Sequence, residues 1–145
     1  MAAYLRMLGF DTWYQNHVDD AALAQMSKEE QRILLTHDQG LLKRSAVTRG
    51  YWVRATAPRE QLREVMARFD LQRMAQPFIR CLSCNGLLRS ASLDEVKAQV
   101  PENAARYYSE FWRCASCGKV YWQGSHYQRM TRLIEESLVI KESRL

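Results

Sequence analysis

Residues 19–38, DDAALAQMSKEEQRILLTHD, place a helix directly before a short apolar strand. Asp19 and Asp20 are suited to cap a helix that runs to about Gln31, and small or apolar residues recur along it at helical spacing. We expect the strand over residues 32–36, where three aliphatic residues stand in a row. A helix that feeds directly into a buried strand is the repeating unit of an α/β fold.

The same alternation of helix and strand extends to both sides of this stretch. Upstream, residues 2–8 read as a helix that ends at Gly9, and residues 10–14 read as a strand. Downstream, the expected segments are a helical turn at 41–43, a strand at 50–54 and a helix at 58–69. This order predicts a parallel sheet with right-handed crossovers and with helices packed on its faces.

The chain has 145 residues, 47% of them hydrophobic and 26% charged, which is typical of a globular protein. No apolar run approaches the roughly 20 residues that cross a bilayer, and the first ten residues do not resemble a secretion signal. We therefore expect a cytoplasmic protein with no membrane partner. Its net charge of +5 is modestly basic and favours polyanionic partners.

All four cysteines of the chain lie in two Cys-x-x-Cys pairs, Cys81 with Cys84 and Cys114 with Cys117. Each pair can present two thiolates from one tight turn, and four thiolates form the tetrahedral site that structural Zn²⁺ prefers. Two disulfides, an iron–sulfur cluster and a redox pair are the alternatives. A linker at residues 71–78 precedes this region, so we predict two domains, 1–75 and 76–145, with helices at 92–110 and 126–138 in the second.

Three aspartates are candidate ligands for a second metal. Asp38 follows the apolar strand, and Asp19 and Asp20 precede the helix that feeds that strand. Residues just beyond the carboxyl ends of parallel strands line the crevice where ligands bind, so Asp38 is placed as a site residue with Asp20 or Asp19 opposite. Clustered carboxylates hold Mg²⁺ or Mn²⁺, and such ions support the hydrolysis of phosphodiesters. The alternative is that these aspartates only cap helices.

Aromatic and basic residues alternate around the second cysteine pair, which is typical of a surface that binds unpaired RNA. The candidate RNA-binding residues are Arg113, Lys119, Trp122, His126 and Arg129. The rings can instead form the core of this small region, and we expect at least Trp112 and Tyr121 to be buried. His126 is not needed as a zinc ligand, because four cysteines already complete the coordination shell.

Taken together, these motifs resemble the Mut-seven C-terminal ribonuclease domain over nearly the whole chain. The resemblance rests on YLRMLGFDT (4–12), on the Asp19-Asp20 helix start, on RILLTHD (32–38), and on the two cysteine pairs with the residues that flank them, RCLSCNG (80–86) and FWRCASCGKVYWQGSH (111–126). It implies a PIN-like nuclease core followed by a zinc ribbon. It also implies a metal-dependent ribonuclease that acts on RNA, expected to be single-stranded, with Asp20, Asp19 and Asp38 as its acidic residues and with Zn²⁺ and Mg²⁺ or Mn²⁺ as its metals.

Members of that family begin with an apolar strand that carries an Asp, directly before the helix that corresponds here to residues 2–6. This chain begins inside that helix. The resemblance thus implies a nuclease core without its first strand, with a neighbouring strand left unpaired and one metal ligand missing. Two functions stay open on this basis: a ribonuclease, impaired or not, and a catalytically inactive zinc-ribbon module that binds RNA or a protein. A thiol redox protein is a third, disfavoured by how well the two pairs match a single metal.

Overall fold

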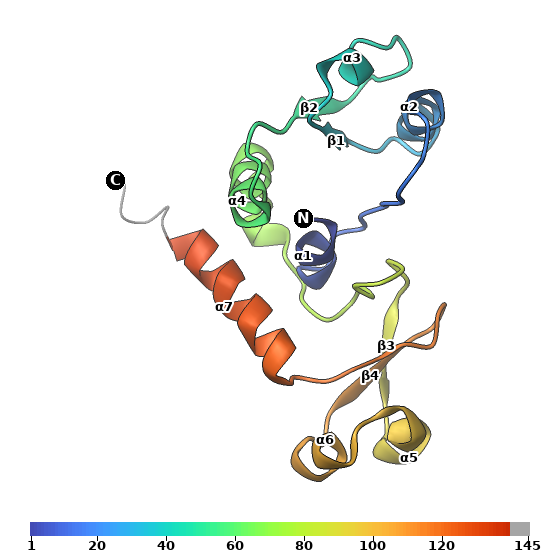
Figure 1. The fold of residues 1–145 in the computed structure, drawn as a ribbon, viewed down its shortest axis with the longest axis vertical. Helices are drawn as coiled ribbons and strands as arrows, with labels where there is room; N and C mark the ends of the chain where they lie inside the picture. The colour runs from blue at the N-terminus through green and yellow to red at the C-terminus, as the bar shows by residue number, and fades with distance from the viewer. Residues whose placement is uncertain (140–145) are drawn as a thin grey trace.

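The computed structural model describes residues 1–139 of the chain, with side chains as far as Glu136 (Figure 1). The elements of its first part are α1 (Ala2–Met7), α2 (Asp20–Glu29), β1 (Leu34–Thr36), α3 (Gln39–Leu42), β2 (Gly50–Trp52), α4 (Pro58–Phe69) and the 3₁₀ turn η1 (Leu71–Met74). Those of its second part are β3 (Leu88–Ala91), α5 (Leu93–Val96), the 3₁₀ turn η2 (Lys97–Gln99), α6 (Glu102–Tyr107), β4 (Phe111–Cys114), β5 (Val120–Tyr121) and α7 (Ser125–Val139).

The first sheet is parallel, as the alternation of helix and strand predicts. β1 pairs with β2 in the register Leu34 with Gly50 and Thr36 with Trp52. Within residues 1–139, β2 is the only strand that pairs with β1, so the other edge of β1 has no strand beside it. The predicted α/β class is confirmed: a parallel sheet with flanking helices is followed by an antiparallel sheet that carries the cysteines.

The strand predicted at residues 10–14 does not form. Arg6 donates through Nε to the carbonyl of Thr12 at 2.8 Å, and the amide of Thr12 donates to Oδ1 of Asn85 at 2.9 Å. Both backbone groups of Thr12 are therefore bound by side chains rather than by a neighbouring strand. The segment runs as an irregular link from α1 to α2.

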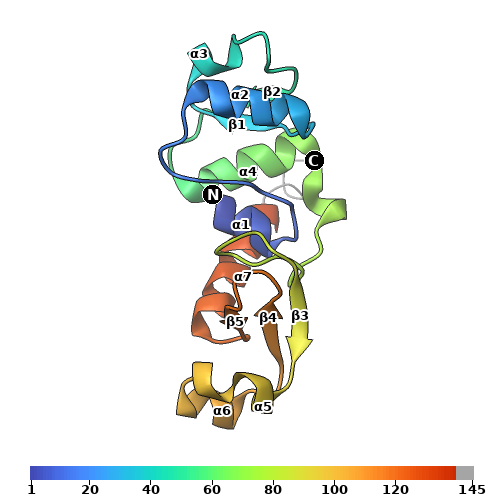
Figure 2. The ribbon, with the colours of Figure 1, turned by 90° about the vertical axis from the view of Figure 1, so that its right-hand side faces the viewer.

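One core joins helices from both ends of the chain. α4 contributes its apolar stripe, and α1 and α7 pack against it, as the two views in Figures 1 and 2 show. The buried members of this core are Leu5, Met7, Leu8, Val53, Leu62, Val65, Met66, Met130 and Ile134. Because α7 completes a core that α1 and α4 begin, this core draws residues from both sides of the predicted domain boundary at residue 75. That boundary stays a prediction, and residues 140–145 of the second predicted domain lie outside the described part.

The second sheet is antiparallel, in the order β3-β4-β5, and has its own small core around Val96 and Phe111. The single helical stretch predicted over residues 92–110 is broken into α5, η2 and α6. Pro101 stands at the start of α6, where it lacks the amide that would continue the preceding turn. At the other end, Ser92 and Glu95 form a capping box that begins α5. α5 and α6 lie at the end of the molecule opposite to the parallel sheet (Figure 2).

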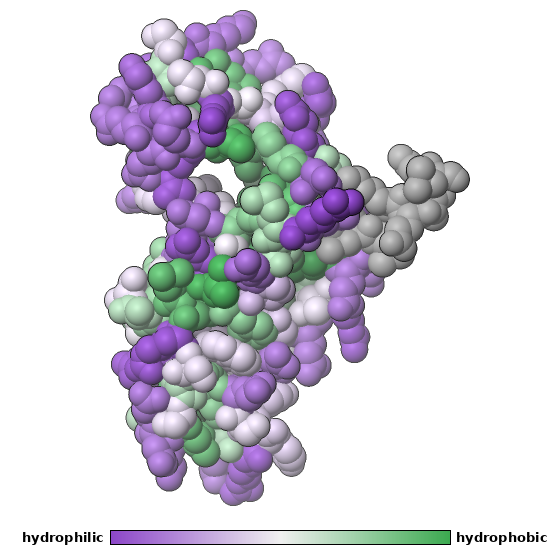
Figure 3. All heavy atoms as spheres, turned by 180° about the vertical axis from the view of Figure 1, so that it is seen from behind, coloured by the Kyte–Doolittle hydropathy of each residue, from purple (hydrophilic) through white to green (hydrophobic). Residues whose placement is uncertain are grey.

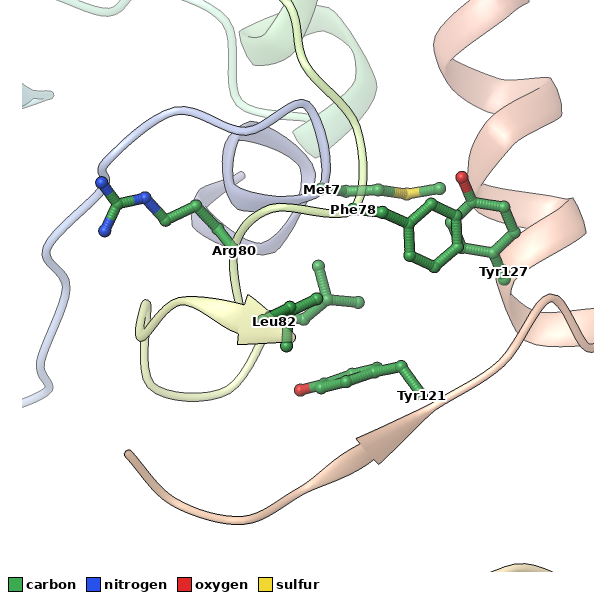
Figure 4. Close-up of a pocket in the computed structure, with 7 residues that line it drawn as sticks. Met7, Phe78, Arg80, Leu82, Tyr121 and Tyr127 are labelled. Carbon is green, nitrogen blue, oxygen red and sulfur yellow. The ribbon is translucent and has the colours of Figure 1, made fainter. Parts of the chain in front are cut away.

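Phe78 fills the junction between the two parts of the chain. Its ring lies 4.2 Å from that of Trp112 and 4.1 Å from that of Tyr127, measured between centroids. The cavity that remains here, lined by Met7, Phe78 and Tyr121 among others, has a volume of about 20 Å³ (Figure 4). Such a space holds about one water molecule, so the junction is closely packed.

Candidate metal centre and acidic edge

The four cysteines form the one cluster of three or more metal-ligating side chains in the part of the chain that the structure describes. Their sulfur atoms all lie within 4.8 Å of one another. The Sγ atoms of Cys84 and Cys114 are 3.4 Å apart, and those of Cys81 and Cys117 are 3.7 Å apart. Zn–S bonds of about 2.3 Å in a tetrahedron place the sulfurs about 3.8 Å apart. This arrangement fits a metal such as zinc.

The same distances disfavour the disulfide alternative. A disulfide requires about 2.05 Å between sulfurs, and all four cysteines are free. Cys81 and Cys114 are buried while Cys84 and Cys117 are exposed, so the cluster lies at the surface of the second sheet.

Local backbone geometry turns each cysteine pair toward the centre. Asn85 and Gly118, which follow the two pairs, have positive φ angles of 70° and 75°. This conformation suits Asn and Gly best and lets each chain reverse after its second cysteine. The amides of Asn85 and Gly118 donate to the carbonyls of Cys81 and Cys114, each at 3.0 Å, which closes both turns.

The thiols of the cluster differ in their readiness to ionise. Burial raises the pKa of Cys114. Hydrogen bonds from the amides of Cys117 and Ser116 and from the neighbouring thiols outweigh this effect and lower the pKa to about 6. For Cys84 the amide of Gly86 lowers the pKa, whereas burial and the other three cysteines raise it, to about 12. Four sulfurs this close cannot all carry negative charge unless a cation lies between them. The donor set can therefore hold a metal ion such as zinc.

The first cysteine turn is bound to α1 by contacts that sequence reasoning did not identify. Arg6 is buried with 6% of its surface exposed, and its Nη1 donates to the carbonyls of Leu82 and Ser83 at 3.0 and 3.2 Å. Asn85 donates to Oδ1 of Asp11 at 2.6 Å. The only sequence signal for Arg6 is an arginine that stands among apolar residues in a short helix.

Asp11 also contacts the segment that leads into the first sheet. Arg32, which lies two residues before β1, binds its two carboxylate oxygens at 3.1 and 3.3 Å. Burial alone would raise the pKa of Asp11, but the hydrogen bonds from Asn85 and Arg32 lower it. Asp11 therefore links the first cysteine turn to the segment that leads into β1.

A cleft of about 1110 Å³ is lined by residues of α1, the irregular link, α2, β1 and α4. The cleft is open to solvent, and an opening through the molecule is visible in the space-filling view (Figure 3). Much of its lining is aliphatic, with Leu5, Leu35 and Val65 as examples, and Thr36 and His37 reach it from the end of β1. Its acidic lining residues are Asp11 and Glu30, and both pair with Arg32.

The three predicted acidic site residues lie outside that lining and act as helix caps or helix starts. Asp38 caps α3 through Oδ1, which accepts from the amides of Gly40 and Leu41 at 2.7 and 3.2 Å. Asp19 caps α2 by accepting from the amide of Ala22 at 2.8 Å, and Asp20 is the first residue of α2. Among the described side chains and backbone groups, the partners of the Asp38 carboxylate all bind Oδ1, which leaves Oδ2 without a hydrogen bond. Whether these acids share a metal ion stays a prediction.

The predicted RNA-binding residues divide by exposure. Lys119, His126 and Arg129 are exposed, and the last two lie in the first turns of α7. Arg113 and Trp122 are half-buried, and Trp122 packs against the second core. Trp112 and Tyr121, expected to be buried, are also half-buried, and the hydroxyl of Tyr121 lies 3.0 Å from Sγ of Cys81.

Fold and centre together define an α/β protein that combines a four-cysteine site able to hold a metal with a parallel sheet whose first strand is followed by an acidic residue. The chain belongs to the Mut7-C RNAse domain family, whose model matches residues 1–134. This confirms the family that the sequence motifs resemble. No curated protein and no solved structure matches the chain. None of the helices in residues 1–139 has the length and apolar character needed to span a membrane.

Proposed function

We propose that the chain is a metal-dependent ribonuclease that hydrolyses phosphodiester bonds in single-stranded RNA. The observation that carries this proposal is the match to the ribonuclease family over residues 1–134, which include both the parallel sheet and the cysteine centre. In this proposal the four cysteines hold a structural Zn²⁺, because their sulfurs complete a tetrahedral shell and leave no position for water. Asp38, Asp20 and Asp19 are the acidic residues of the reaction site.

Asp38 is suited to this role by the way its carboxylate is bound. Oδ1 is fixed by two amides at the start of α3, and this holds the side chain in one orientation. Oδ2 is left for a cation at the carboxyl end of β1, where ligands of parallel sheets bind. Mg²⁺ or Mn²⁺, when bound by these carboxylates, supplies an activated water and neutralises charge on the phosphodiester.

Asp38→Asn is the test, since Asn caps a helix as well as Asp does and the fold is kept. We expect the variant to lose Mn²⁺-dependent cleavage of a single-stranded RNA while it binds that RNA as tightly as the wild type or more tightly. Asp94→Asn, an exposed change in the first turn of α5, is the matched control and should cleave normally. Equal cleavage by the Asp38→Asn and wild-type proteins would refute the assignment of Asp38 to the reaction site.

A second function, an inactive module that binds RNA or a protein, is favoured by one observation. Apart from the cysteines, the described residues contain no cluster of three or more metal-ligating side chains. Cleavage by the wild-type protein separates the two functions: an inactive module shows none with either Mg²⁺ or Mn²⁺, whereas the ribonuclease cleaves.

A further inference from the structure

Residues 39–59 contain five basic residues and no acidic one: Lys43, Arg44, Arg49, Arg54 and Arg59. Residues 39–59 comprise α3, the loop after it, β2, the link that follows and the start of α4. Arg59 pairs with Glu136, but the other four side chains are exposed and form no ion pair with any residue in the described part of the chain. Unpaired cations this dense on one segment mark a surface suited to a polyanion.

β2 also presents an aromatic ring on this surface. Trp52 is 37% exposed, and the guanidinium of Arg54 lies over its ring, 5.0 Å from the centroid. The neighbouring Tyr51 points to the opposite face of the sheet, where its hydroxyl donates to Glu64 of α4 at 2.9 Å. Residues two apart in a strand share a face, so Trp52 lies on the face of Gly50. A side chain at Gly50 would touch Leu42, which places α3 on that face.

The strand register places Trp52 and Arg54 at the same edge of the parallel sheet as Asp38. Thr36 pairs with Trp52, and the amide of Val53 donates to the carbonyl of Thr36 at 2.9 Å, which extends the ladder past the end of β2. Asp38 and Arg54 therefore stand at equivalent positions, each two residues beyond the last pair. Both lie at the carboxyl edge of the parallel sheet, and Asp38 begins the helix that covers the face of Trp52.

We propose that Trp52 and Arg54, which we call the Trp52 platform, bind single-stranded RNA next to Asp38. A base stacks on the ring of Trp52, Arg54 binds the adjacent phosphate, and Lys43, Arg44 and Arg49 contact phosphates further along the strand. This proposal rests on the proposed function for its ligand and adds the place at which the RNA binds. It differs from the surface predicted from sequence, which lies around the second cysteine pair and the start of α7.

The test measures binding of a fluorescent 12-nucleotide uridine RNA with no added Mg²⁺ or Mn²⁺, so that the probe stays intact. Trp52→Leu, which keeps apolar bulk and removes the ring, should weaken binding about 5- to 100-fold. Trp52→Phe keeps a ring and should restore most of the affinity. Arg54→Gln should reduce the slope of log affinity against log salt by about 0.7, the value for one phosphate contact to a single strand.

Two changes near α5 and α6, at the opposite end of the molecule, are the controls. Tyr107 is an aromatic residue 83% exposed in α6, and Lys97 is an exposed cation in η2. Tyr107→Leu and Lys97→Gln should leave affinity and salt slope unchanged. Circular dichroism of each variant checks that the helices are retained.

Wild-type affinity in Trp52→Leu and an unchanged slope in Arg54→Gln would overturn the platform, as would binding that depends instead on Lys119 and Arg129. This outcome is separate from failure of the ribonuclease. If Asp38→Asn abolishes cleavage while the platform variants bind normally, the ribonuclease stands and the platform falls. If the platform variants lose binding while no protein cleaves RNA, the platform stands and the ribonuclease falls.

Discussion

Replacing Arg6 with Met should weaken both the fold and the metal centre. Met keeps an apolar stem of similar length but removes the donors to the carbonyls of Thr12, Leu82 and Ser83. Nη1 is shared between Leu82 and Ser83, so the change removes about two charge-assisted hydrogen bonds, worth roughly 1.5–3 kcal/mol each. Met recovers part of this by packing, and we expect a net loss of about 3 kcal/mol in the free energy of unfolding.

Leu82 and Ser83 stand between Cys81 and Cys84, so the metal should be held less tightly as well. Contacts that orient metal ligands typically affect affinity 10- to 100-fold, and we expect a loss of roughly tenfold because Arg6 binds the turn rather than a ligand atom. Thermal unfolding of the zinc-loaded protein and zinc transfer to a chromophoric chelator measure the two effects. A loss of about 3 kcal/mol lowers the melting temperature by roughly 6–12 °C in a protein of this size.

The control is Arg89→Met, which removes an exposed arginine of β3 whose partners among the described residues are Glu95 and the carbonyl of Ser90. It should change neither measurement appreciably, because exposed ion pairs contribute about 0–1 kcal/mol. Equal melting temperatures and zinc affinities for Arg6→Met and Arg89→Met would refute the role of Arg6. Metal analysis of the wild type should also find about one zinc per chain.

Two further predictions concern pH and backbone conformation. Amides of Arg54 and Ala55 and the hydroxyl of Tyr51 bind the Glu64 carboxylate and hold its pKa below the ordinary value, so its contribution to stability is full at neutral pH and is lost as pH falls through the folded-state pKa. The stability advantage of the wild type over Glu64→Gln should therefore shrink below about pH 4.3, measured by urea unfolding at several pH values; an advantage constant down to pH 3 would contradict it. Gly9 has a φ of +90°, and a Cβ there would overlap the carbonyl of Gln76. Gly9→Ala should lower the free energy of unfolding by about 1–3 kcal/mol, whereas Gly40→Ala in α3 should lower it less or raise it. Equal melting temperatures for the two variants would contradict this prediction.

Local patterns predicted the elements whose causes are local. α4 matches its predicted bounds because Pro58 fixes its start and its apolar residues repeat at helical spacing. The spacing of the two Cys-x-x-Cys pairs predicted that the cysteines cluster, and their four sulfur atoms lie within 4.8 Å of one another. The strand predicted at residues 10–14 failed because the partners of Thr12 are the side chains of Arg6 and Asn85, 6 and 73 residues away.

The candidate site shows the same division. Asp38 was placed at the end of a strand by the apolar run before it, and that placement is confirmed. The cleft beside β1, the bond between Arg32 and Asp11 and the position of Trp52 opposite Thr36 depend on how distant segments pack. No periodicity in the sequence carries that information. The sequence therefore predicts which segments carry the chemistry, and packing decides what lies next to them.

The contact between Arg6 and the turn at Leu82 and Ser83 has a consequence for how the protein is made. During synthesis α1 is made before the turn that its arginine binds, because Leu82 and Ser83 follow Arg6 by 76 and 77 residues. The core that contains α1 and α4 is completed later still, when Met130 and Ile134 have been synthesised. The apolar faces of α1 and α4 are therefore fully covered only after the segment that carries the four cysteines has been synthesised.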